Sequence, residues 1–203
     1  MSRKTFGVGV IGQGEYSHLA RKINGKHTKV YSVWHDMLCR CYSKNFHKKR
    51  PTYIDCEVCE EWHNFQNFAK WYEENYYEIE GQKMCLDKDI LFKRNKIYSP
   101  QTCMFVPQRI NVLFTKRQND RGEYPIGVSW VERDRVFRSY CSKYINGKNK
   151  NIYLGSYHSV EEAFMAYKNF KEEYIKEIAD EYKCYIPIEL YEALYRYKVE
   201  ITD

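Results

Sequence analysis

A strand passes into a helix within the segment NIYLGSYHSVEEAFMAY, residues 151–167. Its first part, residues 151–157, is predicted as the strand. Ser159 then follows as a helix N-cap, and Glu162, three residues later, completes the spacing of a capping box. Apolar side chains recur beyond the cap at helical intervals, through Val160, Ala163, Phe164, Tyr167, Tyr174 and Ile178. The segment therefore predicts one long helix whose apolar face can cover a sheet.

Two further strands are predicted upstream, over residues 125–131 and 135–144. The later one is joined to the strand at 151–157 across Asn146-Gly147, a pair that readily takes the positive φ angles of a tight hairpin. Because side chains alternate along a strand, every other residue from Phe137 to Cys141 is expected to face the helix. The predicted order is three antiparallel strands backed by one helix.

Three motifs in this region occur in a family-like order and spacing: Ile126-Gly127-Val128, residues 153–157 and residues 159–167. They resemble the Gly-Val, Leu-Gly-Thr-Phe and Glu-Glu-Ala...Ala-Tyr signatures of AP2 (integrase-like) DNA-binding modules, and the resemblance covers roughly residues 123–178. It implies a sheet that lies in the major groove of double-stranded DNA. The residues it implies as DNA contacts are Ser129, Trp130, Arg138, Tyr140, Ser142, Asn151 and Tyr153.

The first half of the chain is predicted to begin with a Gly-rich, extended lead-in of about thirty residues. Apolar periodicity predicts helices over residues 31–41 and 60–72. Strands are predicted over 84–92 and 103–106, with a helix over 108–115. The chain is thus expected to be α+β, with domains at 1–118 and 119–180, a polar linker at 119–122, and a C-terminal helix and tail at 181–203.

The motifs Leu86-Asp87-Lys88-Asp89 and Tyr98-Ser99-Pro100, followed by Cys103 and Asn111, resemble the nuclease core of phage-type HNH endonucleases. Trp34, Arg40-Cys41-Tyr42 and residues 58–62 resemble the segment that precedes this core, so that the match spans about residues 31–111. The resemblance implies a small ββα-metal domain, and phage proteins of this kind often carry an AP2 module behind the nuclease.

HNH chemistry uses a histidine as general base and a divalent cation on the scissile phosphate. In this sequence Asp87 matches a metal ligand and Asn111 the helix ligand, so the resemblance implies Mg²⁺ or another divalent cation at these residues. Lys88 stands at the histidine position, and Thr102 at the middle asparagine. Lysine has an unperturbed pKa of about 10.4 and is a poor base at neutral pH, although it could neutralise phosphate charge.

The leading hypothesis is therefore a DNA endonuclease of nicking or homing type with an altered catalytic centre. His35 or His63 could supply a base from elsewhere in the chain. The alternative is a catalytically inactive relative that acts as a sequence-reading DNA-binding protein or regulator. A third hypothesis, from a different class, is a protein–protein interaction module.

The charge pattern supports a polyanionic partner. The net charge is +6, and residues 91–118 contain basic residues without a single acidic one. Candidate phosphate contacts in this part of the chain are Lys93, Arg94, Arg109, Lys116 and Arg117. A second run, residues 40–50, has five basic residues and no acidic one.

The eight cysteines are expected to be reduced thiols, because no signal-peptide or membrane-spanning segment is recognised and the chain is expected in the cytosol of a phage host. Cys39, Cys41, Cys56 and Cys59 offer a four-thiolate zinc site as an alternative metal centre. Against it, residues two apart on a helix point to different sides. Neither a membrane partner nor a small-molecule substrate is expected, and the oligomeric state stays open.

Overall fold

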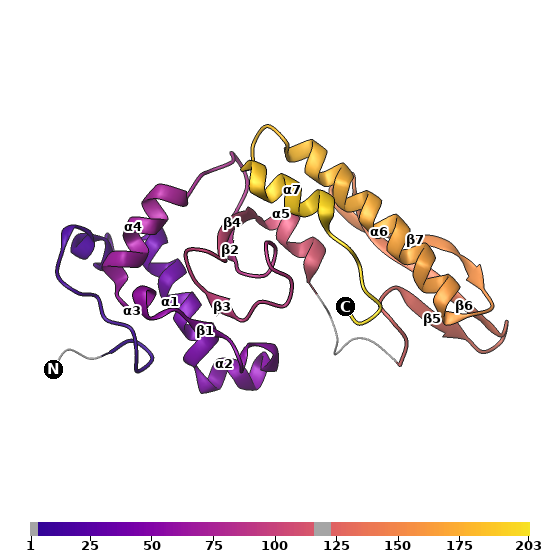
Figure 1. Cartoon of the computed structure of the whole chain (residues 1–203), viewed down its shortest axis with the longest axis horizontal. Helices are drawn as coiled ribbons and strands as arrows, with labels where there is room; N and C mark the ends of the chain where they lie inside the picture. The colour runs from indigo at the N-terminus through magenta and orange to yellow at the C-terminus, as the bar shows by residue number, and fades with distance from the viewer. Residues whose placement is uncertain (1–3, 116–122) are drawn as a thin grey trace. The chain divides into compact units, whose positions relative to one another are not determined.

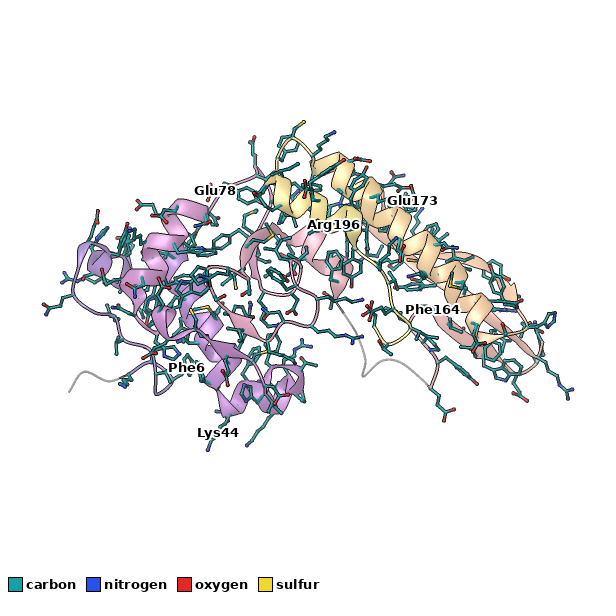
Figure 2. All side chains as sticks on the ribbon, in the orientation of Figure 1. Phe6, Lys44, Glu78, Phe164, Glu173 and Arg196 are labelled. Atoms are coloured by element: carbon teal, nitrogen blue, oxygen red, sulfur yellow. The ribbon has the colours of Figure 1, made fainter. Side chains whose placement is uncertain are left out.

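The computed structural model describes residues 4–115 and 123–203, which form an α+β protein with three small sheets (Figure 1; side chains in Figure 2). The chain divides into two compact units, Met1–Gln108 and Arg109–Asp203. The predicted linker, residues 119–122, and the predicted domain boundary at 118–119 lie outside the described residues. No helix in the described ranges combines the length and the apolar character that crossing a bilayer requires.

Short helices dominate the first unit. They are η1 (Glu15–Ala20), α1 (Lys29–Tyr42), α2 (Lys44–Lys49), η2 (Pro51–Tyr53), α3 (Glu60–His63) and α4 (Phe65–Asn75). The prediction of a helix over residues 31–41 is confirmed by α1, which begins where the Thr28 side chain accepts a hydrogen bond from the Tyr31 amide. The N-terminal lead-in is more structured than expected, because it contains η1 and its Val10 pairs with Asn64.

The prediction of one continuous helix over residues 60–72 is wrong. Asn64 separates α3 from α4, and its side chain accepts a hydrogen bond from the Gln66 amide at 3.1 Å, so that it caps the second helix. Its backbone is extended and forms a bridge with Val10. A contact with a segment more than fifty residues away breaks the helix here, and periodicity within the helix does not report such a contact.

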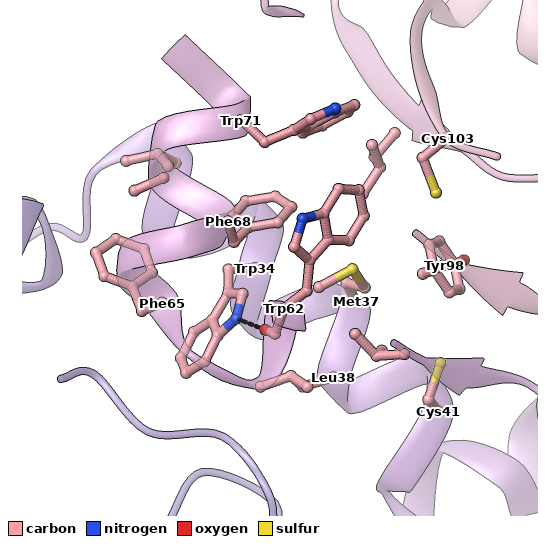
Figure 3. Close-up of a cluster of buried hydrophobic side chains, with 14 of the residues drawn as sticks. Trp34, Met37, Leu38, Cys41, Trp62, Phe65, Phe68, Trp71, Tyr98 and Cys103 are labelled. Atoms are coloured by element: carbon pink, nitrogen blue, oxygen red, sulfur yellow. Dashed lines mark hydrogen bonds between the residues drawn. The ribbon is translucent and has the colours of Figure 1, made fainter. Parts of the chain in front are cut away.

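An aromatic core holds the first unit together (Figure 3). Trp34 of α1 and Trp62 of α3 have no exposed surface, and the Trp34 indole Nε1–H donates to the Trp62 carbonyl oxygen at 2.7 Å. Phe68 of α4 packs edge-on against the Trp62 ring, with 5.1 Å between their centroids. Burying rings of this size stabilises the unit by several kcal/mol, at about 25 cal/mol per Å² of apolar surface.

Two two-stranded sheets complete the first unit. Parallel strands β1 (Glu57–Val58) and β3 (Ile97–Tyr98) form one sheet, and antiparallel strands β2 (Met84–Asp87) and β4 (Met104–Pro107) form the other. The predicted strand over 84–92 is confirmed only to Asp87. The Asp87 side chain accepts hydrogen bonds from the amides of Asp89 and Ile90, both at 2.8 Å, which turns the chain out of the strand.

A single α-helix over residues 108–115 was expected after β4. The structure has the short helix α5 (Gln108–Asn111) followed by the 3₁₀ helix η3 (Val112–Phe114). The element type is thus confirmed only for the first turn.

The second unit contains the three-stranded antiparallel sheet β5–β6–β7: β5 (Val128–Val131), β6 (Val136–Ile145) and β7 (Lys148–Tyr157). The predicted hairpin is confirmed at Asn146-Gly147, whose φ angles are 51° and 80°. Gly127 precedes β5 with φ of +80°, and a Cβ there would meet the Tyr167 ring at 2.1 Å. A larger residue at this position would therefore push the sheet off the helix that carries Tyr167.

That helix is α6 (Val160–Tyr182), and α7 (Ile188–Arg196) packs on it (Figure 1). The predicted cap is confirmed, since the Ser159 side chain accepts a hydrogen bond from the Glu162 amide at 3.2 Å. The core between sheet and helix contains Cys141 of β6 with Phe164 and Tyr167 of α6. Val199, in the segment after α7, joins this core.

Candidate functional site

The face of the β5–β6–β7 sheet opposite α6 gathers most of the predicted contact residues. Directly paired residues on antiparallel strands share a face. Arg138 pairs with Ser129 on one side and Ser156 on the other, Tyr140 pairs with Tyr153, and Ser142 pairs with Asn151. We call this set the outer face: Ser129, Arg138, Tyr140, Ser142, Asn151, Tyr153 and Ser156.

The alternation of β6 confirms which side is buried. Ser139 and Cys141 are 0% and 2% exposed, and Cys141 packs in the core against α6. On the outer face Ser142, Asn151 and Tyr153 are exposed. The register shifts between Ser139 and Tyr140, and this irregularity keeps Tyr140 and Tyr153 paired on one side.

Trp130 does not belong to the outer face. It pairs with Phe137, and their rings lie 4.7 Å apart between centroids. Phe137 alternates with Ser139 and so shares the face of α6. The Trp130 Nε1–H donates to the Glu132 carboxylate at 2.5 Å. The structure thus separates Trp130 from the other predicted sheet contacts.

Arg138 is held by an acid that the sequence prediction missed. Its Nη2 lies 2.6 Å from an Asp134 carboxylate oxygen, and Asp134 also binds Arg133 at 2.8 Å. The hydrogen bond from Arg133 and the positive charge of Arg138 hold the pKa of the Asp134 carboxyl below its ordinary value. The sequence contained one signal for this ion pair, the four-residue spacing from Asp134 to Arg138. Such a spacing indicates an ion pair only when helical or turn geometry is known.

The outer face also carries two neighbouring phenols. The rings of Tyr140 and Tyr153 lie 5.4 Å apart between centroids, and the Tyr153 hydroxyl lies 2.8 Å from the Ser156 hydroxyl. Hydrogen bonding to the Tyr140 side chain raises the pKa of Arg138. The face therefore offers hydroxyl and amide groups, which can both donate and accept hydrogen bonds, around one cationic side chain.

The second candidate site lies around Asp87 and Lys88 in the first unit. Lys88 is only 6% exposed; its ammonium binds the Asp89 carboxylate and donates to the Asn95 carbonyl oxygen at 2.6 Å. Burial raises the pKa of the Asp87 carboxyl, whereas the hydrogen bonds that it accepts from two backbone amides lower this pKa. These contacts use both side chains to hold the loop between β2 and β3.

The other positions of the nuclease-like pattern are also engaged in local contacts or belong to the second unit. The Thr102 hydroxyl donates to the Ile97 carbonyl oxygen at 2.7 Å. Asn111 is the last residue of α5 and belongs to the second unit, whereas Asp87 belongs to the first. His63 Nε2 lies 3.1 Å from the Tyr42 hydroxyl, and the His35 ring packs against Phe6.

Three of the four cysteines of the zinc alternative belong to the aromatic core or pack against it: Cys41, Cys56 and Cys59. Cys41 and Cys56 are buried, while Cys39 and Cys59 are half-buried. Burial raises the pKa of the Cys41 thiol to about 12, and it also raises the pKa of Cys56 and Cys59. These thiols are therefore protonated at neutral pH while no metal ion is bound. Within residues 4–115 and 123–203, no group of three or more His, Cys, Asp and Glu side chains is arranged to hold a metal ion.

The predicted basic contacts belong to both units. Arg109 lies in the second unit, where it pairs with Glu181 at 2.7 Å and stands over the rings of Tyr144 and Tyr182. Lys93 is half-buried and Arg94 is exposed, in the loop between β2 and β3. Lys116 and Arg117 lie outside the described residues.

Comparison of the chain with family models, with curated proteins and with solved structures finds no match.

Proposed function

We propose that this protein binds double-stranded DNA through the outer face of the β5–β6–β7 sheet and reads base edges with it. The observation that carries the proposal is the gathering of Arg138, Asn151 and several hydroxyls on one face. Arginine can bind guanine, and asparagine adenine, through two hydrogen bonds each, while serine hydroxyls bind any base. The order of β5, β6, β7 and α6 supports an AP2-like module.

The size of the sheet suits a major groove. Neighbouring strands lie about 4.8 Å apart, so the axes of the outer two strands are separated by about 10 Å. The major groove is about 12 Å wide. A three-stranded sheet can therefore enter the groove with one face toward the bases, as β-strand readers do.

DNA binding without cleavage is the form of this function that we favour. The order β2, β4, α5 is compatible with an HNH-like ββα unit, and Asp87 ends its first strand. Cleavage, however, needs a base that can reach the attacking water. Lys88 is buried and bound to Asp89 and Asn95. The His63 ring contacts the Tyr42 hydroxyl, and the His35 ring packs against Phe6 and lies 3.9 Å from the Asp36 carboxylate.

Selection from random duplexes tests the proposal. The wild-type protein is expected to enrich a defined motif. The variants Arg138→Gln and Asn151→Ala are each expected to weaken binding to that motif by about 1–3 kcal/mol and to relax the preference at one base pair. Arg196→Gln is the matched control, because it also removes an acid-paired arginine, here from α7.

The control should bind as the wild type does. A wild-type protein that enriches no motif, or outer-face variants that bind the motif as tightly as the control, would refute the proposal.

A further inference from the structure

We infer that the short helix α2 is a second contact with DNA, one that binds the phosphate backbone without reading sequence. The surface consists of Lys44, Lys48 and Lys49 of α2, Arg50 directly after it, and Lys96. We call it the α2 basic surface. The inference rests on the proposed function, because the polyanion it assigns to this surface is the DNA that the outer face reads.

Exposure and a lack of acids define the surface. Lys44, Lys48, Lys49 and Arg50 are all exposed, and residues 43–54 contain no acidic residue. Within the described parts of the chain, none of these four side chains forms an ion pair. Some exposed cations elsewhere pair with acids, as Arg196 does with Glu192 and Lys176 with Glu173. The α2 basic surface thus has positive charge that no ion pair among the described residues neutralises.

Helix stability alone does not account for this charge. Lysines at the C-terminal end of α2 interact favourably with the helix dipole, which explains Lys48 and Lys49. Lys44, however, is the first residue of α2, where the dipole disfavours a cation. It also stands four residues before Lys48, and like charges at this spacing repel each other. The arrangement has an electrostatic cost that a bound anion would remove.

The backbone beneath the surface is firmly held. The His47 ring donates from Nε2 to the Arg40 carbonyl oxygen of α1 at 2.8 Å, and the Phe46 ring packs edge-on against Tyr53 with 5.6 Å between centroids. Lys96 is brought to the same place, since its ammonium donates to the Thr52 carbonyl oxygen at 3.2 Å. Figure 2 shows Lys44 directed away from the rest of the first unit. These contacts therefore fix the backbone that carries the charged side chains.

The charge density matches that of a duplex. A helix of six residues is about 9 Å long at 1.5 Å per residue. Double-stranded DNA carries one charge per about 1.7 Å of its axis when both strands are counted, so the same length of duplex has about five phosphates on its two strands. The α2 basic surface has a comparable number of cations, whereas the outer face has Arg138 alone, already paired with Asp134. Phosphate contacts that the outer face lacks can thus come from α2.

Salt dependence of DNA binding tests the inference. The test variant of the full chain combines Lys44→Gln, Lys48→Gln and Lys49→Gln. Its binding to duplex DNA is measured by fluorescence anisotropy from about 50 to 200 mM salt. Each phosphate contact contributes about 0.9 to the slope of log K against log salt, so the slope should become shallower by about 2–3. The motif enriched from random duplexes should not change, because α2 reads no bases.

A second triple variant is the control and combines Lys176→Gln, Lys183→Gln and Arg196→Gln. It removes the same net charge, but from α6, from the residue directly after α6 and from α7. We expect it to keep the wild-type slope. An equal decrease of slope in both variants would overturn the inference, because net charge alone would then explain it. An unchanged slope in the α2 variant would overturn it too, while loss of motif enrichment in Arg138→Gln would still support the outer face. If the wild-type protein does not bind DNA, the proposed function fails, and the inference with it.

Discussion

Asp87 ends β2 and fixes the loop that follows, and this role accounts for its position without a metal ion. One carboxylate oxygen, Oδ1, accepts hydrogen bonds from the amides of both Asp89 and Ile90. Alanine at this position would leave two amides without their acceptor, and the expected loss is about 2 kcal/mol in the free energy of unfolding. Asparagine keeps an oxygen in the same place and removes a charge that burial disfavours, so Asp87→Asn should change the unfolding free energy by less than about 1 kcal/mol.

Urea unfolding of the two variants measures this difference, and supercoiled-plasmid cleavage with Mg²⁺ or Mn²⁺ tests the nuclease hypothesis on the same proteins. We expect no nicking by the wild type. Nicking by the wild type that disappears in a normally stable Asp87→Asn protein would instead establish Asp87 as a residue of a metal-dependent nuclease.

Single residues show where sequence reasoning reaches its limit. Alternation along β6 correctly assigned Ser139 and Cys141 to the buried side, because one face of the sheet is covered. Trp130 was assigned from a motif, and only the register with Phe137 places it on the other face. The burial of Lys88 depends on Asp89 and on Asn95, seven residues away in a loop. No periodic pattern in the sequence encodes such a loop contact.

At the scale of elements, local signals were sufficient where local contacts set the boundary. The Ser159 cap of α6 and the turn at Asn146-Gly147 are of this kind. Where a distant segment sets the boundary, as Val10 does at Asn64, the sequence predicted one helix and the structure has two. The segment after α7 was expected as a simple tail, but hydrogen bonds to α6 hold it.

Glu172 of α6 is central to these hydrogen bonds. Its carboxylate accepts from the Lys168 ammonium at 2.7 Å, the Val199 amide at 2.9 Å and the Lys198 ammonium at 3.1 Å. Burial raises the pKa of Glu172, but these hydrogen bonds together lower it below the ordinary value of 4.5. The unfolded chain therefore takes up a proton on Glu172 at a higher pH than the folded protein does. The stability from this carboxylate is present above about pH 4.5 and disappears as the pH falls through its lowered pKa.

The variant Glu172→Gln should consequently lose about 1–2 kcal/mol of unfolding free energy at pH 7 and lose less than the wild type on acidification. Urea unfolding between about pH 3 and pH 7 measures both effects. Glu173→Gln is the matched control, because Glu173 is the exposed neighbour on the same helix and pairs with Lys176. If the control loses as much stability as Glu172→Gln, the segment after α7 is not held through Glu172.

At the scale of the whole molecule, each unit has its own core, one aromatic and built from helices, the other between a sheet and α6. The sequence indicated two parts from the change in pattern, from mixed helices and strands to three strands and a helix. Charge was also informative at this scale: four of the five basic residues in the run at 40–50, all except Arg40, lie on the exposed α2 basic surface. From the run at 91–118, Lys96 contributes to the same surface, whereas Arg109 pairs with Glu181 and stands over two tyrosine rings.

This division predicts how DNA binding separates between the units. A fragment of residues 109–203 contains the outer face, α6, α7 and the core that joins them, so it is expected to fold alone with a cooperative unfolding transition. In selection from random duplexes it should enrich the same motif as the full chain, because base contacts specify the sequence. It lacks α2, so its affinity should be lower, and its slope of log K against log salt should be shallower by about 0.9 for each phosphate that α2 binds in the full chain.

Circular dichroism checks the folding of this fragment, and anisotropy titrations measure the slope. A folded fragment with the same slope as the full chain would contradict the assignment of phosphate binding to the first unit. A folded fragment that enriches another motif would contradict the assignment of base reading to the second unit, because the bases would then be read partly by residues that the fragment lacks.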